Sequence, residues 1–429
     1  MLARVECRAA PRRFATWLPW LAVVTFWSAG ASGGSPQADV PVTLSVQEAL
    51  ARAETRAPEV SFARHAVKDA EARRVGAAIL FPQNPRLSVD VRPPLRGGAP
   101  SDVGYGATAD FLLEVGGAPS ARGREAVRHV DVANAELRVQ RLHARAYVWA
   151  AYVRALVADA RIGELRFAIG VGTRVLSASR QRAEAGASGD IEQTLAESEL
   201  AQLEAAATAA ARLRDGHVMA VRDAIDLPAN VPLTLSSALA EPGPVPSAET
   251  IAARALGARA DLEAIRRRID VLVATEERLA KEVFPRVGGY LGVDAAPLSP
   301  LYGVVGISVE LPVAQRNQGP IARAVAQREG EMDRLELEAR RIVRDVYAAH
   351  SAFEARRKEL RLLTEGALPT AERTLELVET GWRSGRFDIF RVTSAARDLV
   401  RVRSLRLDAM EAAWMERITL DRVAGGLAT

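Results

Sequence analysis

Apolar residues recur every three or four positions over two long stretches of the chain, which predicts two long helices. In the second stretch, residues 319–383, only Arg328 and Arg356 interrupt this spacing. The apolar members are Ile321, Val325, Met332, Leu335, Ala339, Ile342, Val346, Ala349, Phe353, Leu360 and Leu363. At about 1.5 Å per residue the helix would be on the order of 100 Å long. It is therefore a rod that packs on other helices, and its two arginines either face a wetter wall or extend from a solvated edge.

The first long stretch, residues 120–184, contains no proline and has the same spacing. Its apolar face comprises Val132, Ala135, Val139, Leu142, Ala146, Trp149, Val153, Leu156, Ala160, Gly163 and Phe167. Each rod ends at a turn with two glycines, Gly186 and Gly189 in the first and Gly381 and Gly385 in the second. Return helices are predicted at 190–225 and 387–424. Pro369 occurs in the second rod alone and predicts a bend there before the turn.

Each rod is preceded by two segments in which apolar and polar residues alternate, a pattern typical of strands with one apolar face. These strands are predicted at 87–93 and 105–115, and again at 287–294 and 302–311. A further helix precedes each strand pair, at 44–80 and at 248–282, and a Phe-Pro dipeptide ends it. Pro58 is either tolerated near the start of the first of these helices or marks a break in it.

The second half of the chain therefore repeats the first. Phe284 follows Phe81 by 203 residues, Glu310 follows Glu114 by 196, and the turn glycine Gly385 follows Gly186 by 199. We infer an internal duplication. The repeats span residues 32–226 and 248–429, and the proline-rich segment 227–247, predicted to lack regular structure, links them.

The four strands set a requirement on assembly. Four strands cannot close a barrel, and an open sheet leaves edges with unpaired amides. In a soluble protein another layer could cover the sheet. However, small and polar residues on one face and apolar residues on the other are typical of outer-membrane strands, which alternate between lipid and lumen. In that case several copies must contribute strands to one barrel.

Residues 1–31 have the features of a signal peptide. Arginines at positions 4, 8, 12 and 13 precede the apolar run 14–27, and small residues follow. A retained membrane anchor and a twin-arginine signal are the alternatives. Cys7, the one cysteine, would leave with this segment, so we expect an exported chain without disulfides or lipid anchor.

Composition argues against several other classes of protein. Of the 429 residues 48% are apolar and 26% charged, and +3 of the net charge of +4 lies within residues 1–31. The remainder lacks the basic footprint of a nucleic-acid-binding protein. The five histidines have no metal-ligand spacing, and there is no phosphate-binding Gly-Lys-Ser/Thr loop. We therefore expect no enzymatic activity, no cofactor and no metal site.

Several motifs resemble the TolC-type outer-membrane efflux proteins. These are the segment 44–50 (LSVQEAL), the segment 255–262 (ALGARADL), which is close to the family's AL..RPDL, and the turn 381–385 (GWRSG), in which Trp382 stands at the family's usual tyrosine. The segment 111–117 (FLLEVGG) followed by 122–124 (RGR) is similar to the heavy-metal efflux branch. The resemblance covers nearly all of the chain after residue 31.

This resemblance implies a mainly α fold with a small transmembrane β part. Three chains would form a 12-stranded outer-membrane barrel, continued by a helical barrel that tapers to a closed periplasmic tip, with 227–247 in an equatorial belt. The function implied is a passive exit duct of a tripartite efflux or type I secretion-like system, working with a periplasmic adaptor and an inner-membrane pump. The rival interpretation is a periplasmic coiled-coil adaptor or a structural rod without a pore.

The resemblance also indicates candidate gate residues at the tip. The two positions where the family carries aspartates after the second turn are occupied by Arg391 and Ser394. The family's first-turn acid is matched by Glu192, while its basic partner falls on Phe387, beside Arg386 and before Asp388. We hypothesise that Glu192 pairs with Arg386 or Arg391 across neighbouring hairpins. The alternative is that these residues are solvated helix-end charges.

Overall fold

The structure is a computed structural model that describes residues 42–81, 83–93, 103–184, 190–295, 300–384 and 386–426. All of them belong to one compact unit. The predicted signal peptide and the turn glycines Gly186, Gly189 and Gly385 lie outside the described residues.

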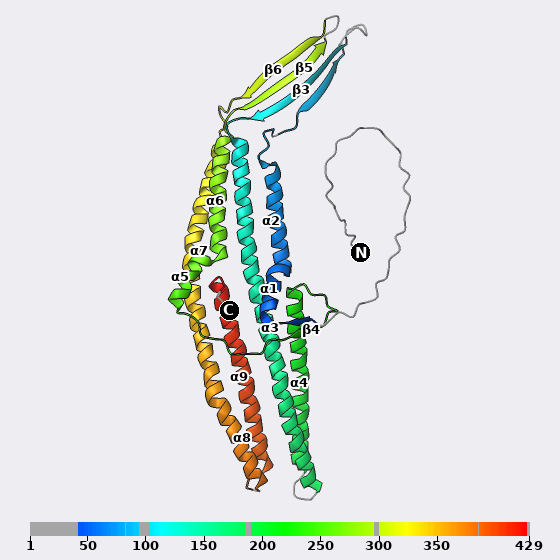
Figure 1. The fold of residues 1–429 in the computed structure, drawn as a ribbon, viewed down its shortest axis with the longest axis vertical. Helices are drawn as coiled ribbons and strands as arrows, with labels where there is room; N and C mark the ends of the chain where they lie inside the picture. Colours follow the sequence, from blue (N-terminus) through cyan, green and yellow to red (C-terminus); the bar gives the residue numbers. More distant parts are fainter. Residues whose placement is uncertain are drawn as a thin grey trace, which may run out of the picture. The chain divides into compact units, whose positions relative to one another are not determined.

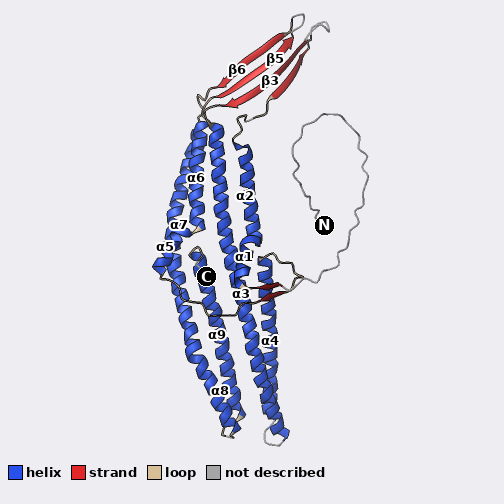
Figure 2. Cartoon of the chain, in the orientation of Figure 1, coloured by secondary structure: helices blue, strands red, loops and turns tan. Residues whose placement is uncertain are grey.

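Four antiparallel strands form one sheet beyond the end of the helices (Figure 1 and Figure 2). The strands pair in the order β2, β3, β5, β6, so that the second strand of one repeat pairs with the first strand of the other. Their bounds are Arg86–Arg92 for β2, Gly104–Glu114 for β3, Arg286–Ala295 for β5 and Tyr302–Glu310 for β6. Within the chain, β2 and β6 are edge strands with one unpaired side each.

Helices make up most of the rest of the unit. Their bounds are Val46–Arg56 (α1), Pro58–Ala77 (α2), Ala118–Glu184 (α3), Asp190–Ala224 (α4), Ala248–Ala258 (α5), Ala260–Lys281 (α6), Gln318–Arg361 (α7), Leu368–Arg383 (α8) and Ile389–Val423 (α9). The long helix α3 packs against α1, α2, α4, α6 and α9, so it joins the two repeats. A mainly helical fold with long helices and strand pairs, as the sequence predicted, is confirmed.

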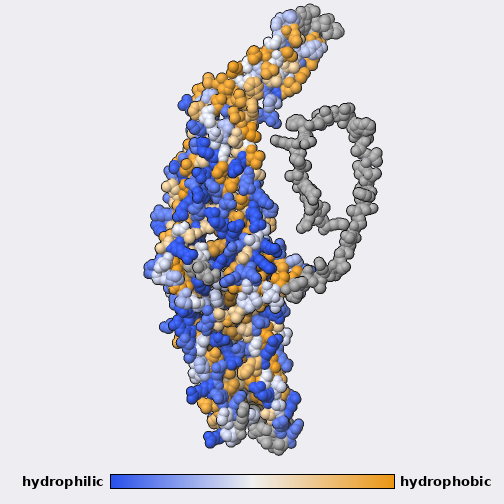
Figure 3. Space-filling view, in the orientation of Figure 1, coloured by the Kyte–Doolittle hydropathy of each residue, from blue (hydrophilic) through white to orange (hydrophobic). Residues whose placement is uncertain are grey.

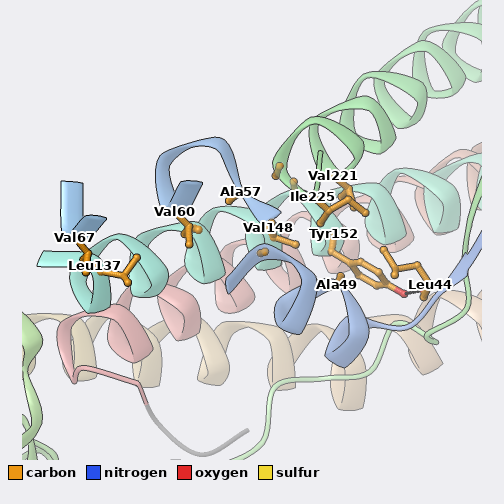
Figure 4. Packing of buried hydrophobic residues seen from close by; sticks show 14 of the residues in the cluster. Leu44, Ala49, Ala57, Val60, Val67, Leu137, Val148, Tyr152, Val221 and Ile225 are labelled. Atoms are coloured by element: carbon orange, nitrogen blue, oxygen red, sulfur yellow. Dashed lines mark hydrogen bonds between the residues drawn. The ribbon is translucent and has the colours of Figure 1, made fainter. Parts of the chain in front are cut away.

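The largest apolar cluster lies where α1, α2 and α4 meet α3 (Figure 4). Val60 and Val67 of α2 and Val148 and Tyr152 of α3 are buried there. The predicted seam of α7 is buried over its middle part, from Ile342 to Leu360, whereas Met332 nearer the sheet is 53% exposed. Nearer the sheet the seam is only partly covered, since Ile321, Val325 and Leu335 are half-buried.

Each of the helices predicted at 44–80 and 248–282 is broken; Pro58 marks the break in the first, one of the two alternatives, whereas the break in the second was not predicted. Ser45 caps α1 in a capping box with Glu48. The helix ends before Ala57, because the ring of Pro58 disfavours a helical conformation of the residue that precedes it. In the second repeat the break is at Arg259, whose guanidinium pairs with Asp261 and donates to the carbonyl of Val423 at 2.8 Å. Arg259 thus ties the break to the end of α9.

The linker 227–247 contains a short strand, which the sequence analysis excluded. Strand β4, Leu233–Leu235, pairs in parallel with β1, Val42–Leu44, just before α1. The buried hydroxyl of Tyr152 donates to the carbonyl of Leu44 at 2.8 Å and accepts from the amide of Ser237 at 3.2 Å. Three-residue strands are too short to show alternation, so the prolines around β4 dominated the prediction.

The second rod is not one continuous α-helix. A π-helical turn, Leu362–Ala367, separates α7 from α8, and Pro369 is the second residue of α8. Proline lacks an N–H and clashes with the carbonyl four residues earlier in an α-helix. A π-helical turn directly before it leaves room for the ring.

This π-helical turn accommodates one additional residue. Buried residues of α3 recur in α7 after 198 positions, as in Ala144 and Ile342, Val148 and Val346, and Ala151 and Ala349. After the turn, buried residues of α4 recur in α9 after 199 positions, as in Ala196 and Ala395, Ala210 and Ala409, and Val221 and Leu420. The extra residue lies in the second repeat, where the helix changes to π geometry.

Candidate functional site

The turn between α8 and α9 is closed by the carbonyl of Gly381. This carbonyl accepts hydrogen bonds from the amides of Arg386 at 2.8 Å and Phe387 at 3.3 Å, and from the hydroxyl of Ser384 at 2.9 Å. A β-carbon on Gly381 would lie 2.3 Å from the Phe387 ring. Only glycine fits here, because the ring folds back onto the helix end.

Asp388 caps α9, which therefore begins at Ile389 rather than at the predicted residue 387. The carboxylate of Asp388 accepts a hydrogen bond from the amide of Arg391 at 3.0 Å. The Arg391 guanidinium lies 5.0 Å from the centre of the Phe387 ring, an arrangement typical of a cation–π contact. Arg386 is exposed. Asp388 thus has a structural role at the tip.

Other tip candidates lie on the inner side of the second hairpin. Trp382 is half-buried against a cluster that contains Leu375, Val392 and Leu399. Ser394 is exposed and lines a pocket that also contacts α3 and α4 of the first hairpin. The side chain of Glu192 lies outside the described part of the chain, so its pairing with Arg386 or Arg391 stays a prediction.

Arginines of α9 join the two hairpins, which the sequence analysis missed. Arg397 makes two hydrogen bonds of 2.5 Å to the carboxylate of Glu199 on α4. Arg403 donates to Glu164 of α3 and to Glu372 of α8, both at 2.8 Å, and lies over the Phe167 ring. The hydrogen bond to Glu199 raises the pKa of Arg397 above its ordinary value. Opposite charges 198 positions apart gave no local signal in the sequence.

An apolar groove of about 320 Å³ lies between α3, α4 and α9, beside the Arg397–Glu199 pair. Phe167, Val171 and Val175 of α3 form one side, and Leu203 and Val400 belong to the other two helices. The groove follows the junction between the first and second hairpins.

The sheet has one apolar and one polar face. Leu87 and Val89 of β2 and Val305 and Ile307 of β6 are all more than 70% exposed, and the sheet is mostly orange in Figure 3. On the opposite face Arg92 of β2 pairs with Asp90 at 2.8 Å and reaches across β3 to Asp294 of β5.

Two glycines of β3 make the crossing of Arg92 possible. Gly104 stands directly opposite Arg92, and a β-carbon on Gly106 would meet the Asp90 carboxylate at 2.6 Å and the Arg92 guanidinium at 3.0 Å. Asp90, Gly106 and Asp294 share one register row of the sheet. The polar face therefore carries a charged cluster that spans three strands.

A buried carboxylate marks the junction between sheet and helices. Glu114, the last residue of β3, is 6% exposed and pairs with Arg122 of α3 and, at 3.7 Å, with Arg286 of β5. Arg122 also donates to the carbonyls of Ala77 and Ile79 at 3.2 and 3.1 Å. Both residues belong to the motif that resembles the heavy-metal efflux branch, and their contacts are structural.

In the described ranges, no group of three or more His, Cys, Asp and Glu is arranged to hold a metal ion. None of the described helices combines the length and the apolar character needed to cross a membrane.

Comparison with known proteins identifies the family. Residues 252–426 match the family model described as outer membrane efflux protein. Over these residues the chain belongs to the outer membrane efflux protein family. Members are transport channels, and this efflux protein is accordingly a transport protein and not an enzyme.

A curated relative of this efflux protein is the cobalt-zinc-cadmium resistance protein CzcC of Cupriavidus metallidurans. It is 25% identical over 324 residues, which cover 74% of this chain and 76% of the relative. Among solved structures, the open-state MtrE channel of Neisseria gonorrhoeae superposes with a TM-score of 0.72 at 17% identity, covering 89% of each chain. The outer membrane protein VceC of Vibrio cholerae superposes with a TM-score of 0.70 at 17% identity, and the match covers 89% of this chain and 96% of that chain.

Proposed function

We propose that three copies of this efflux protein form the exit duct of a tripartite efflux system in the outer membrane. The observation that supports this most is the sheet, whose apolar face is exposed and whose two edge strands, β2 and β6, each have one unpaired side. Three such sheets joined edge to edge would leave no open edge, and their apolar faces would contact lipid. The polar faces would then line the lumen.

The long helices would continue this duct through the periplasm to a tip formed by the turns beside Gly381. A periplasmic adaptor and an inner-membrane pump would dock there, and the duct itself would conduct passively. The similarity to CzcC supports divalent metal cations as the cargo, with drugs or a type I secretion-like cargo as alternatives. Export through residues 1–31 without lipidation stays a prediction.

Fractionation of producing cells tests this proposal. We expect the chain in the outer membrane, requiring detergent, as a trimer that dissociates on heating, and conducting ions in planar bilayers. A soluble periplasmic monomer would instead indicate the rival adaptor or rod.

The cargo is tested separately, by deleting the gene in its own host. If divalent metals are exported, the deletion strain should lose tolerance to cobalt, zinc or cadmium while its tolerance to dyes and detergents is unchanged. The reverse outcome would leave the duct intact and remove the metal assignment.

A further inference from the structure

The polar face of the sheet carries a tyrosine set among glycines. Tyr290 of β5 shares this face with Gly288 and Gly292, because every second residue of a strand points to the same side. On the neighbouring strand β6, Gly306 stands directly opposite Tyr290. Glycine inside a strand weakens the sheet and often marks a place where another group approaches closely.

The ring of Tyr290 lies over Gly306. A β-carbon on Gly306 would be 2.2 Å from Cζ and 2.3 Å from the hydroxyl oxygen of Tyr290. Gly306 is half-buried although β6 is an edge strand, whereas its neighbours Val305 and Ile307 on the apolar face are 83% and 78% exposed. The ring is therefore folded down against the sheet.

The two flanking glycines offer the ring no second place on the sheet. A β-carbon on Gly288 would lie 2.3 Å from the hydroxyl oxygen of Ser308, and one on Gly292 would lie 2.7 Å from the methyl carbon of Thr108. Side chains of the neighbouring strands already occupy the space above both glycines. A ring displaced from Gly306 would therefore move away from the sheet.

We propose that Tyr290 limits the size of what passes through the sheet part of the duct, and that Gly306 keeps this passage wide by holding the ring against the wall. This inference rests on the proposed function, in which the polar face lines the lumen. A ring that leaves the sheet then enters the lumen, where three copies would each contribute one ring.

A second long side chain of the polar face is held in a similar way. Arg92 lies over Gly106 of β3, whose β-carbon would be 3.0 Å from the guanidinium. Asp90 and Asp294 also bind Arg92 through ion pairs. The neutral ring of Tyr290 cannot form ion pairs, so its position depends on the free space above the glycine opposite it.

The apolar face provides a matched control. Phe111 of β3 lies over Gly289 of β5, whose β-carbon would be 2.3 Å from Cζ of the ring. An aromatic ring over a glycine can simply stabilise a sheet. Phe111 points away from the lumen, so its displacement should not affect passage, whereas that of Tyr290 should.

Thiol labelling from outside intact cells tests the proposal. In a Cys7→Ser background, Glu310→Cys places a thiol on the polar face, two rows of that face nearer the helices than Tyr290. Its labelling rate is measured with a small methanethiosulfonate and with a bulky dye-linked maleimide. Adding Gly306→Ala should lower the rate of the bulky reagent several-fold and leave that of the small reagent unchanged.

Two further variants separate a narrowed passage from a weakened sheet. Gly306→Ala combined with Tyr290→Ala should restore the rate of the bulky reagent, because no ring is left to enter the lumen. Gly289→Ala, which displaces the Phe111 ring toward lipid, should leave both rates unchanged.

Several results would overturn the proposal. One is a rate of the bulky reagent that Gly306→Ala does not change, and another is an equal fall in Gly289→Ala. Loss of the trimer in Gly306→Ala would also overturn it, because packing would then fix the ring in place. A thiol at position 310 that even the small reagent fails to reach would refute the lumen itself, and the proposed function with it.

Discussion

At the scale of single residues, the motif positions that resemble the family hold the backbone in place. Gly381 closes a turn, Asp388 caps a helix, and Asp261 of the ALGARADL segment binds Arg259 and the amide of Leu262. The sequence located all three residues, but not these roles, because a cap or a bidentate contact depends on backbone geometry.

Replacing Gly381 by alanine should destabilise the tip. The new β-carbon would overlap the Phe387 ring, and overpacking of this kind costs about 1–3 kcal/mol. Hydrogen exchange of the amides at residues 386–391 should accelerate. Gly163→Ala is the matched control, since its β-carbon meets nothing within 4 Å, and it should leave exchange at the tip unchanged.

The Arg259–Asp261 contact should make the second repeat sensitive to acid. Burial opposes ionisation, but the hydrogen bond and charge of Arg259 hold the pKa of Asp261 below its ordinary 3.8. A lowered folded-state pKa means that the carboxylate stabilises the fold above that ordinary value, and that this contribution is lost as pH falls through the folded-state pKa. Thermal unfolding of the native protein and of Asp261→Asn should therefore differ at neutral pH and converge below about pH 4. A constant difference across this range would contradict the assignment.

At the scale of elements, periodicity predicted the long helices and the strand pairs well. It missed β1 and β4, which are too short for a period to show, and the π-helical turn, which leaves the apolar spacing on either side undisturbed. It also missed the ion pairs between hairpins, because residues such as Glu199 and Arg397 meet only after both hairpins have folded.

Removing the additional residue should convert the second rod into one continuous α-helix. We expect deletion of Gly366 combined with Pro369→Ala to preserve the fold, because the buried faces before and after the turn stay in phase. Hydrogen exchange over residues 362–369 should slow. Deleting Arg166 from α3, which has no π-helical turn, is the control and should destabilise the protein, because one residue rotates the rest of a helix by about 100°.

At the scale of the whole molecule, the edges and the apolar face of the sheet indicate assembly with further copies. The edge strands β2 and β6 each have one unpaired side, and the apolar face of the sheet is exposed within one chain. The sequence predicted this need from the count of four strands.

The closed state of the assembled duct provides a test of the predicted gate. If Glu192 pairs with Arg391 of a neighbouring hairpin, Glu192→Ala and Arg391→Ala trimers should each show a higher leak conductance in planar bilayers than the unmodified protein. Ser394→Ala, a polar change at the same tip, is the control. Conductance equal to that of the unmodified trimer in both charge variants would exclude the pairing.

The one-residue difference between the repeats also records the history of the chain. A residue that is additional in the second copy and has no counterpart in the first must have been inserted into the second, or lost from the first, after the gene segment was doubled. From that event onward the two hairpins could no longer exchange places by recombination without shifting a helix face. The π-helical turn therefore records one of the length changes by which two equal copies became two distinct parts.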